Sequence, residues 1–183
     1  DPIIQRLEDK TENIIDDLML EIFEEFISLE KPDMVGFTVP FPGNLYAALK
    51  CGQFLKNRYP DVSVVFGGGY PCTELRQLTD PRVFDYTDFI VLDDGEIPIL
   101  RLSEYIKDQP KTTLIRTFYR ENGQVMYSYG TEKDIPFSEN GIPDYSGLPM
   151  GKYFTMMEMP NPMHTLWSYG YWNKISLAHG CYW

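Results

Sequence analysis

Two turns of this chain carry residues that could bind or transform a ligand. Gly67, Gly68 and Gly69 follow the apolar run Val62–Phe66, and the acidic turn Asp93–Glu96 follows a second apolar run. A backbone without side chains lets a flat or phosphate-bearing group approach closely. Paired carboxylates can act as acid and base or bind a cation. The two turns therefore indicate a ligand-binding site.

Each turn also has a purely structural explanation. The glycines fit a tight turn that needs positive φ, although one glycine would satisfy such a turn, so both explanations stay open for Gly67–Gly69. Acids at the start of a helix stabilise its N-terminus, and we favour this explanation for Asp93, Asp94 and Glu96. Glu96 is in addition a candidate to hydrogen-bond the ribose or tail of a ligand.

Two further polar residues follow another apolar run, Met34–Val39. Thr38 lies near its carboxyl end, where its hydroxyl group could meet a ligand, and Asn44 ends the rigid loop Pro40–Asn44. Such side chains also cap the local backbone. We favour capping for Asn44, which together with Gly43 is placed to begin a helix, and leave both explanations open for Thr38.

The elements around these residues form a pattern of strand, glycine turn, helix, strand and acidic turn. This βαβ order predicts a parallel sheet, and ligands bind beyond the carboxyl ends of the strands in such sheets. We therefore predict a three-layer, flavodoxin-like (Rossmann-like) α/β fold. Thr38, the glycines and the acidic turn should share one edge of the sheet.

The rest of the chain has fewer signals of chemistry. The segment Asp1–Asn13 is polar and predicted to be irregular. Ile14–Leu29 has apolar residues at helical spacing, with Glu21, Glu24 and Glu25 on a solvated face. Asn122-Gly123 between two β-rich runs predicts a hairpin. The remaining predictions are helices over Leu45–Tyr59, Cys72–Leu78 and Glu96–Ile106, hairpin strands over Thr112–Tyr119 and Gln124–Tyr129, and an extended linker over Thr131–Asn173.

Composition disfavours several classes of partner. The 183 residues are 43% hydrophobic and carry a net charge of −11, which disfavours nucleic acid and anionic membranes. No run of about 18 apolar residues could span a membrane. The three cysteines lack the spacing of a disulfide framework, so we expect a reducing cytoplasm. No ligand spacing supports a metal site at Cys72 or His164.

The motifs together resemble the cobalamin-binding-type domain that precedes the catalytic barrel of many radical S-adenosylmethionine enzymes. The strand ending Gly36–Pro40, the Gly67–Gly69 turn and the Asp93–Glu96 turn are similar to three motifs of that family. A linker like Ile142–Pro149 then leads to the barrel. The barrel's first strand, which Ile175–Cys181 resembles, opens a Cys-x3-Cys-x2-Cys motif. The resemblance covers about three quarters of the chain and rests on the order and spacing of the motifs together.

The resemblance implies a domain over 1–130, a linker over 131–173 and the start of the barrel over 174–183 of a longer polypeptide. The front strands of the domain would precede Asp1. The domain would cover the barrel of the same polypeptide and hold cobalamin or substrate near a 4Fe–4S cluster that binds S-adenosylmethionine. Cys181 would be the first cluster ligand. The residues implied to bind the cofactor are Thr38, Asn44, Gly67, Gly68, Gly69, Gly95 and Glu96.

Two departures from the family limit these expectations. The cobalt-binding Asp-x-His-x-x-Gly motif is absent, and the only histidines are His164 and His179. A single thiolate cannot hold a cluster that needs three, so this chain alone should perform no radical chemistry. The alternative is a cofactor-free scaffold or interaction domain with the same fold. A nucleotide-binding Rossmann enzyme is disfavoured, because Gly67–Gly69 lacks the spaced glycines of that fingerprint.

Overall fold

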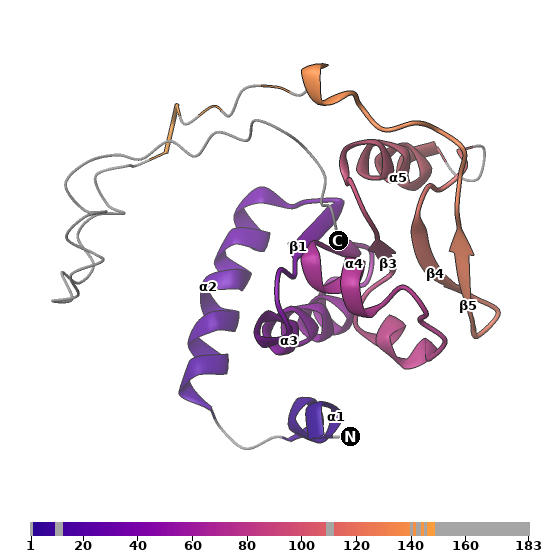
Figure 1. The fold of residues 1–183 in the computed structure, drawn as a ribbon. Helices are drawn as coiled ribbons and strands as arrows, with labels where there is room; N and C mark the ends of the chain where they lie inside the picture. The colour runs from indigo at the N-terminus through magenta and orange to yellow at the C-terminus, as the bar shows by residue number, and fades with distance from the viewer. Residues whose placement is uncertain are drawn as a thin grey trace, which may run out of the picture. The chain divides into compact units, whose positions relative to one another are not determined.

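A computed structural model describes residues 2–9, 13–108, 112–139, 141, 144 and 146–148. The chain separates into two compact units, Asp1–Asp134 and Ile135–Trp183. Figure 1 shows the elements in chain order. They are α1 (Pro2–Glu8), α2 (Ile14–Glu30), β1 (Met34–Thr38), α3 (Pro42–Arg58), β2 (Ser63–Gly67), α4 (Gly69–Glu74), η1 (Pro81–Asp85), β3 (Phe89–Val91), α5 (Glu96–Asp108), β4 (Thr117–Glu121), β5 (Gln124–Ser128) and η2 (Phe137–Glu139).

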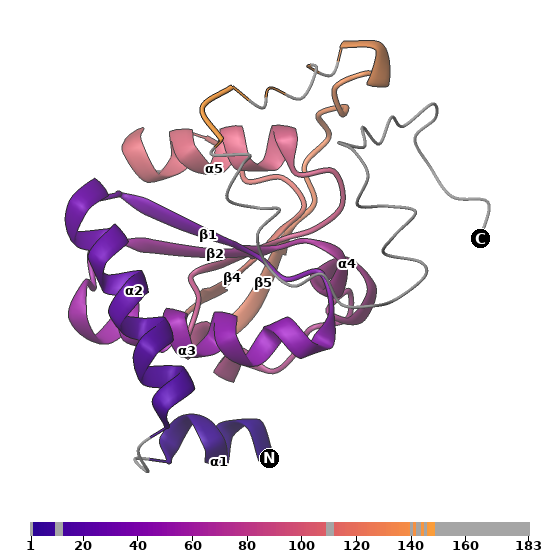
Figure 2. The same cartoon turned by 90° about the vertical axis from the view of Figure 1, so that its left-hand side faces the viewer.

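The first unit is built on one five-stranded sheet in the order β1-β2-β3-β4-β5. β1, β2 and β3 are parallel, and β4 and β5 are antiparallel to their neighbours. In Figure 2, α5 covers one face of the sheet and α3 covers the other. The predicted α/β fold with a parallel sheet and an added hairpin is thereby confirmed.

β2 lies between β1 and β3, and its residues Val64, Val65 and Phe66 are apolar because both faces of the sheet are covered there. Val64 and Phe66 belong to the larger core cluster, which also includes Leu49 and Leu55 of α3. Val65 points to the other face and packs in a second cluster with Leu102 of α5. This alternation of side chains, two residues per period, divides the core between the two faces.

The small residues inside α3 allow close packing. A Cβ atom on Gly52 would lie 2.1 Å from the backbone oxygen of Tyr86, so only glycine fits where the helix meets the end of η1. The neighbouring Cys51 is buried. Packing accounts for both of these small residues.

The hairpin extends the sheet at β3 and turns at the predicted dipeptide. Asn122 and Gly123 both have positive φ, 50° and 76°, as a two-residue type I′ turn requires. Its first strand is shorter than predicted, beginning at Thr117. The preceding Arg116 has a φ of 44°, which interrupts extended backbone.

Two predictions near the helices were wrong. The N-terminal segment is not irregular, because α1 forms there and Leu7 is buried in the larger core cluster. The helix after the glycines is α4, which begins at Gly69 and ends at Glu74 instead of spanning Cys72–Leu78. Pro71 is tolerated because it lies in the first turn of α4.

The helical spacing predicted for α2 is confirmed, but the apolar residues that defined it do not form its buried face. Phe23 and Ile27 make the contact with the core instead. The six exposed positions are Ile14, Ile15, Leu18, Ile22, Phe26 and Leu29, with exposed fractions from 49% to 82%. Among the described residues, no helix combines the length and apolar character needed to cross a membrane.

Candidate functional site

The carboxyl ends of the three parallel strands meet at one edge of the sheet, as predicted. The Val39 N–H donates to the oxygen of Gly67 at 2.7 Å, and the Tyr70 N–H donates to the oxygen of Val39 at 2.9 Å. The Asp93 N–H donates to Cys72 Sγ at 3.0 Å, which joins the turn after β3 to α4. Thr38, the glycines and the acidic turn are therefore neighbours.

Gly68 and Gly69 are required by the packing of the chain itself. Gly68 has φ 98° and ψ −169°, a conformation that is essentially restricted to glycine. A Cβ there would lie 3.0–3.1 Å from atoms of Thr38 and Val39. A Cβ on Gly69 would lie 2.8 Å from the backbone oxygen of Pro40. The loop after β1 thus occupies the space that these two glycines leave.

Gly67 and Gly95 have more space around them than Gly68 and Gly69. A Cβ on Gly67 would meet only the oxygen of Val91, at 3.8 Å, and a Cβ on Gly95 would meet nothing within 4 Å. Neither glycine has positive φ. Neither packing nor backbone conformation therefore accounts for glycine at these two positions, which leave bare backbone at the same edge.

The polar candidates at this edge are exposed. Thr38 ends β1, and Asn44 lies in the first turn of α3. Asn44 does not cap that helix, contrary to the prediction. α3 begins at Pro42, which suits a first helical position because proline has no N–H to satisfy. Phe41 is the N-cap residue and makes no side-chain cap hydrogen bond.

An arginine side chain stabilises the acidic turn Asp93–Glu96. Arg76, two residues beyond the end of α4, forms an ion pair with Asp93, whose own φ is 62°. The pKa of the Arg76 guanidinium is raised, first by its hydrogen bond to Asp93 and second by the negative charge of the Asp93 carboxylate. Glu96 is exposed and begins α5, where a carboxylate suits the helix dipole. The structural explanation that we favoured for the acids agrees with these contacts.

Arg116 is a residue at this edge that sequence analysis missed. It donates through Nη2 to the backbone oxygen of Asp94 at 2.9 Å and forms an ion pair with Asp134. Its side chain is 13% exposed, and its Nε is buried without a hydrogen-bond partner among the described residues. Its own carbonyl accepts from the Leu92 N–H at 2.9 Å. No sequence signal distinguishes it from the other arginines of the chain.

The two described cysteines differ in their surroundings. Burial raises the pKa of the Cys51 thiol to about 11. Cys72 is half-buried beside the acidic turn. Within the described part of the chain, no group of three His, Cys, Asp or Glu side chains could hold a metal ion. Cys181, His164 and His179 lie outside the described residues, as does most of the predicted linker.

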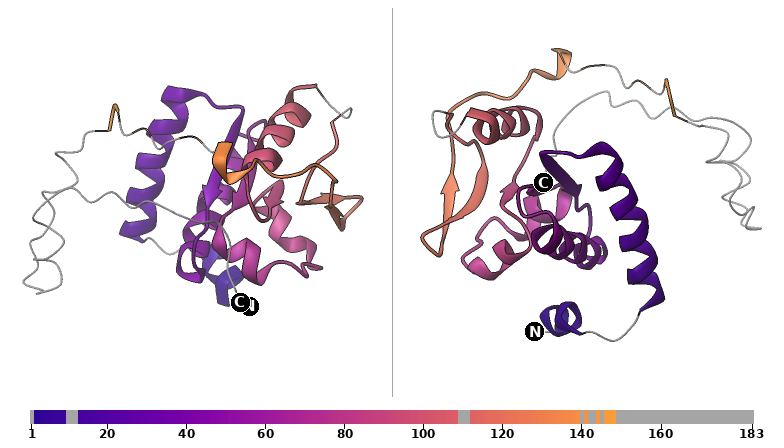
Figure 3. Two further views of the ribbon diagram at one scale, coloured as in Figure 1. Left: turned by 45° about the horizontal axis from the view of Figure 1, so that its top comes forward. Right: turned by 180° about the vertical axis from the view of Figure 1, so that it is seen from behind.

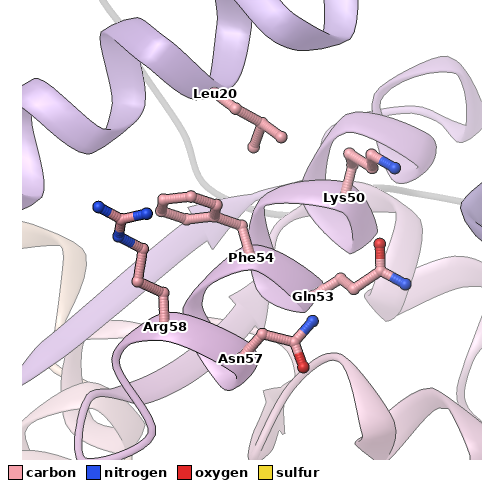
Figure 4. Close-up of a pocket in the computed structure, with 6 residues that line it drawn as sticks. All are labelled: Leu20, Lys50, Gln53, Phe54, Asn57 and Arg58. Carbon is pink, nitrogen blue, oxygen red and sulfur yellow. The ribbon is translucent and has the colours of Figure 1, made fainter. Parts of the chain in front are cut away.

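A hollow of about 460 Å³ lies between α2 and α3. Figure 4 shows Leu20 projecting from α2 toward Phe54 of α3, with Arg58 beside Phe54. Arg58 is paired with Glu24. None of the six lining residues is a predicted site residue. The lining is Leu20, Lys50, Gln53, Phe54, Asn57 and Arg58.

Comparison with known proteins gives a distant similarity to a methyltransferase. No protein-family model matches the chain. The chain is 29% identical over 147 residues to a protein of Pyrococcus horikoshii named uncharacterized methyltransferase PH0819. The match covers 78% of this chain and 30% of that protein, so the chain spans about a third of that relative's length.

Proposed function

We propose that this chain is the domain of a methyl-transferring radical S-adenosylmethionine enzyme that holds cobalamin or substrate. The observation that carries the proposal is the meeting of the ends of β1, β2 and β3 at one edge, where such sheets bind ligands. The name of the Pyrococcus relative supports methyl transfer as the context. The cobalamin and the radical mechanism rest on the resemblance of the motifs.

The described residues fit a cofactor at this edge in part. Gly67 and Gly95 present backbone that no side chain covers, and Thr38 presents an exposed hydroxyl group. These residues, with Asn44 and Glu96, would hold the nucleotide tail of cobalamin. When bound, cobalamin supplies a cobalt centre able to carry a methyl group. The Asp-x-His-x-x-Gly motif, whose histidine would bind the cobalt, is absent from this sequence.

Gly68 and Gly69 have a different place in this proposal. They set the position of the loop Val39–Pro40 and so shape the edge, without themselves contacting the ligand. In the whole protein, Cys181 would be the first of three cluster ligands, and the barrel that holds the cluster would be the domain's partner.

Titration with hydroxocobalamin, followed by its absorbance, tests the proposal. We expect weak binding to the wild-type chain and its loss in Gly95→Val, because the added side chain would fill the open space. The control is Gly36→Val, since a Cβ on Gly36 also meets nothing within 4 Å but lies in the middle of β1. Binding that survives Gly95→Val would place the ligand elsewhere.

A cofactor-free scaffold is the second candidate. It is favoured by the packing of Gly68 and Gly69 against the β1 loop and by the pairing of Asp93 with Arg76. Both observations explain conspicuous residues of the edge without a ligand. No detectable hydroxocobalamin binding by the folded chain would favour this candidate.

A further inference from the structure

The strand β5 ends the sheet and has one open edge. The strand order is β1-β2-β3-β4-β5, so β5 pairs with β4 and with no other strand among the described residues. In both views of Figure 3 the hairpin, drawn as salmon to orange arrows, lies at the margin of the first unit on the side away from α2. An edge strand presents unpaired N–H and C=O groups to which another strand can add. The open side of β5 is therefore a candidate interaction surface.

The residues of β5 lack the features that commonly protect an exposed edge. Natural edge strands are interrupted by proline or carry lysine and other charged side chains. The segment Gln124–Tyr129 contains no proline and no charged residue, although 23% of the residues of the chain are charged. Its exposed side chains are large, since Met126, Tyr127 and Tyr129 are 37%, 39% and 73% exposed. A further strand would both satisfy the unpaired backbone groups and cover these side chains.

The register of the hairpin determines which backbone groups point to the open side. Glu121 pairs with Gln124 across the two-residue turn, and residues that flank such a turn form a hydrogen-bonded pair. Hydrogen-bonded and non-hydrogen-bonded pairs then alternate along the ladder. The N–H and C=O groups of Val125 and Tyr127 consequently point away from β4.

One register matches β5 with a second copy of itself. Two antiparallel copies form two complete hydrogen-bonded pairs when Val125 of each copy lies opposite Tyr127 of the other. Met126 then lies opposite Met126 of the second copy, on the two-fold axis, and Gln124 lies opposite Ser128. Large apolar and aromatic side chains thereby meet one another, and polar side chains meet polar ones.

The neighbouring registers are poorer. Shifting one copy by two residues would place Val125 opposite Tyr129, whose oxygen already accepts from the Arg116 N–H at 3.1 Å. A shift in the other direction would place Tyr127 opposite Gly123, whose φ of 76° belongs to the hairpin turn and not to a strand. β5 is thus complementary to itself in one register, as a two-fold interface requires.

Charge favours a second copy over a basic partner at this edge. Because Gln124–Tyr129 is uncharged, β5 itself offers no carboxylate that would attract a cationic segment. Two copies with a net charge of −11 each repel at long range, but physiological salt largely screens exposed charges that lie more than about 8 Å apart. Association of two copies should therefore strengthen with added salt, whereas binding of a basic partner would weaken.

We propose that two copies of this chain associate through antiparallel pairing of their β5 strands, which joins the two sheets into one. Addition of a strand to an exposed edge is an established mode of recognition, with affinity from the backbone and specificity from the side chains. The interface consists of one short strand from each copy, so the association is weak and depends on concentration. This inference does not rest on the proposed function.

Amide hydrogen exchange, measured by NMR at a low and a high concentration of the chain, tests the register. We expect exchange at Val125 and Tyr127 to slow at the high concentration. Exchange at Met126 and Ser128 should be the same at both concentrations, since these amides already face β4. Sedimentation equilibrium of the same samples should show the average mass rising toward that of a dimer, and rising further with added salt. Unspecific association would not produce the alternation along β5.

Met126 gives the sharpest test, because its two copies lie opposite each other on the two-fold axis. Met126→Lys should weaken self-association about tenfold, and so should Met126→Glu, since like charges directly opposite each other repel and apolar contact is lost. An equimolar mixture of the two variants should associate again, because opposite charges then face each other.

The control for these variants is Ile14→Lys. It adds the same charge as Met126→Lys at a position on α2 that is 82% exposed, so it should change the association by less than about twofold. Met126 is itself 37% exposed on an edge strand, where a charged side chain is tolerated. The unfolding midpoints of all the variants verify that they fold.

Three results would overturn the proposal. The first is a monomer at the highest soluble concentration of the chain. The second is association that Met126→Lys leaves unchanged, which would assign the dimer to another surface. The third is slow exchange at Val125 and Tyr127 that does not depend on concentration, which would show that another part of the same chain covers β5.

Discussion

The two turns at the carboxyl edge of the sheet are fixed by different forces. The turn after β2 is fixed by contact, because Gly68 and Gly69 allow the backbone of Val39 and Pro40 to approach. The turn after β3 is fixed by charge and hydrogen bonds, from Arg76 to Asp93 and from Arg116 to the oxygen of Asp94. Substitutions should therefore be costly in the first turn and milder, and dependent on salt, in the second.

The largest effect should come from Gly68→Val. The substitution places a branched side chain in a conformation that only glycine adopts readily, which costs about 1–3 kcal/mol. Crowding against Thr38 and Val39 adds about 1–3 kcal/mol. Urea unfolding should show this loss of stability. The matched control is Gly67→Ala, which should change stability by less than about 0.5 kcal/mol because its Cβ has room. Equal effects of the two substitutions would contradict the contact explanation.

The next largest effect should come from Arg116→Ala, which should lower the free energy of unfolding by about 1–3 kcal/mol. The side chain is mostly buried, and its loss leaves the oxygen of Asp94 and the carboxylate of Asp134 without their cation. Thermal unfolding measures the change. Arg82→Ala serves as the control, because Arg82 pairs with Asp80 on the exposed surface. A smaller loss for Arg116→Ala than for Arg82→Ala would show that the buried arginine does not support the turn.

Arg76→Ala should lower the free energy of unfolding by less than about 1 kcal/mol, because the Arg76 and Asp93 side chains are 52% and 36% exposed. Half a molar or more of added salt should reduce the difference between wild type and variant, because exposed ion pairs are screened. Urea unfolding of both proteins at two salt concentrations measures this difference in stability. A difference that persists in salt would indicate that Arg76 acts through packing.

The last prediction has the smallest effect and concerns how readily the two described cysteines, Cys51 and Cys72, react with an alkylating reagent. Burial raises the pKa of Cys51 to about 11, so the folded chain keeps this thiol protonated at neutral pH, and its thiolate forms only as the pH approaches that value. We expect iodoacetamide to label Cys72 in the folded chain at pH 8 and Cys51 only on unfolding, because the thiolate is the nucleophile. Peptide mass spectrometry identifies the labelled cysteine. Preferential labelling of Cys51 would show that α3 opens readily.

The sequence predicted the parts of the fold that depend on local patterns. β2 was visible as a run of β-branched and apolar residues, and the hairpin as Asn122-Gly123, whose positive φ angles the turn uses. The juxtaposition of Thr38, the glycines and the acidic turn followed from the rule that parallel strands place their carboxyl ends at one edge. Short elements were less predictable, since α1 depends on burial of Leu7 against distant residues.

Only the tertiary structure decided which residues of a local pattern are covered by other parts of the chain. The spacing of apolar residues in α2 is the same whether that face meets the core or the outside, and Phe23 and Ile27 on another face make the core contact. Three consecutive glycines likewise give one signal in sequence, yet Gly68 and Gly69 meet the β1 loop while Gly67 has room. The partner of Arg116, the oxygen of Asp94, is 22 residues away. Periodicity and composition are local properties of a chain, whereas burial depends on which distant segments the fold brings into contact.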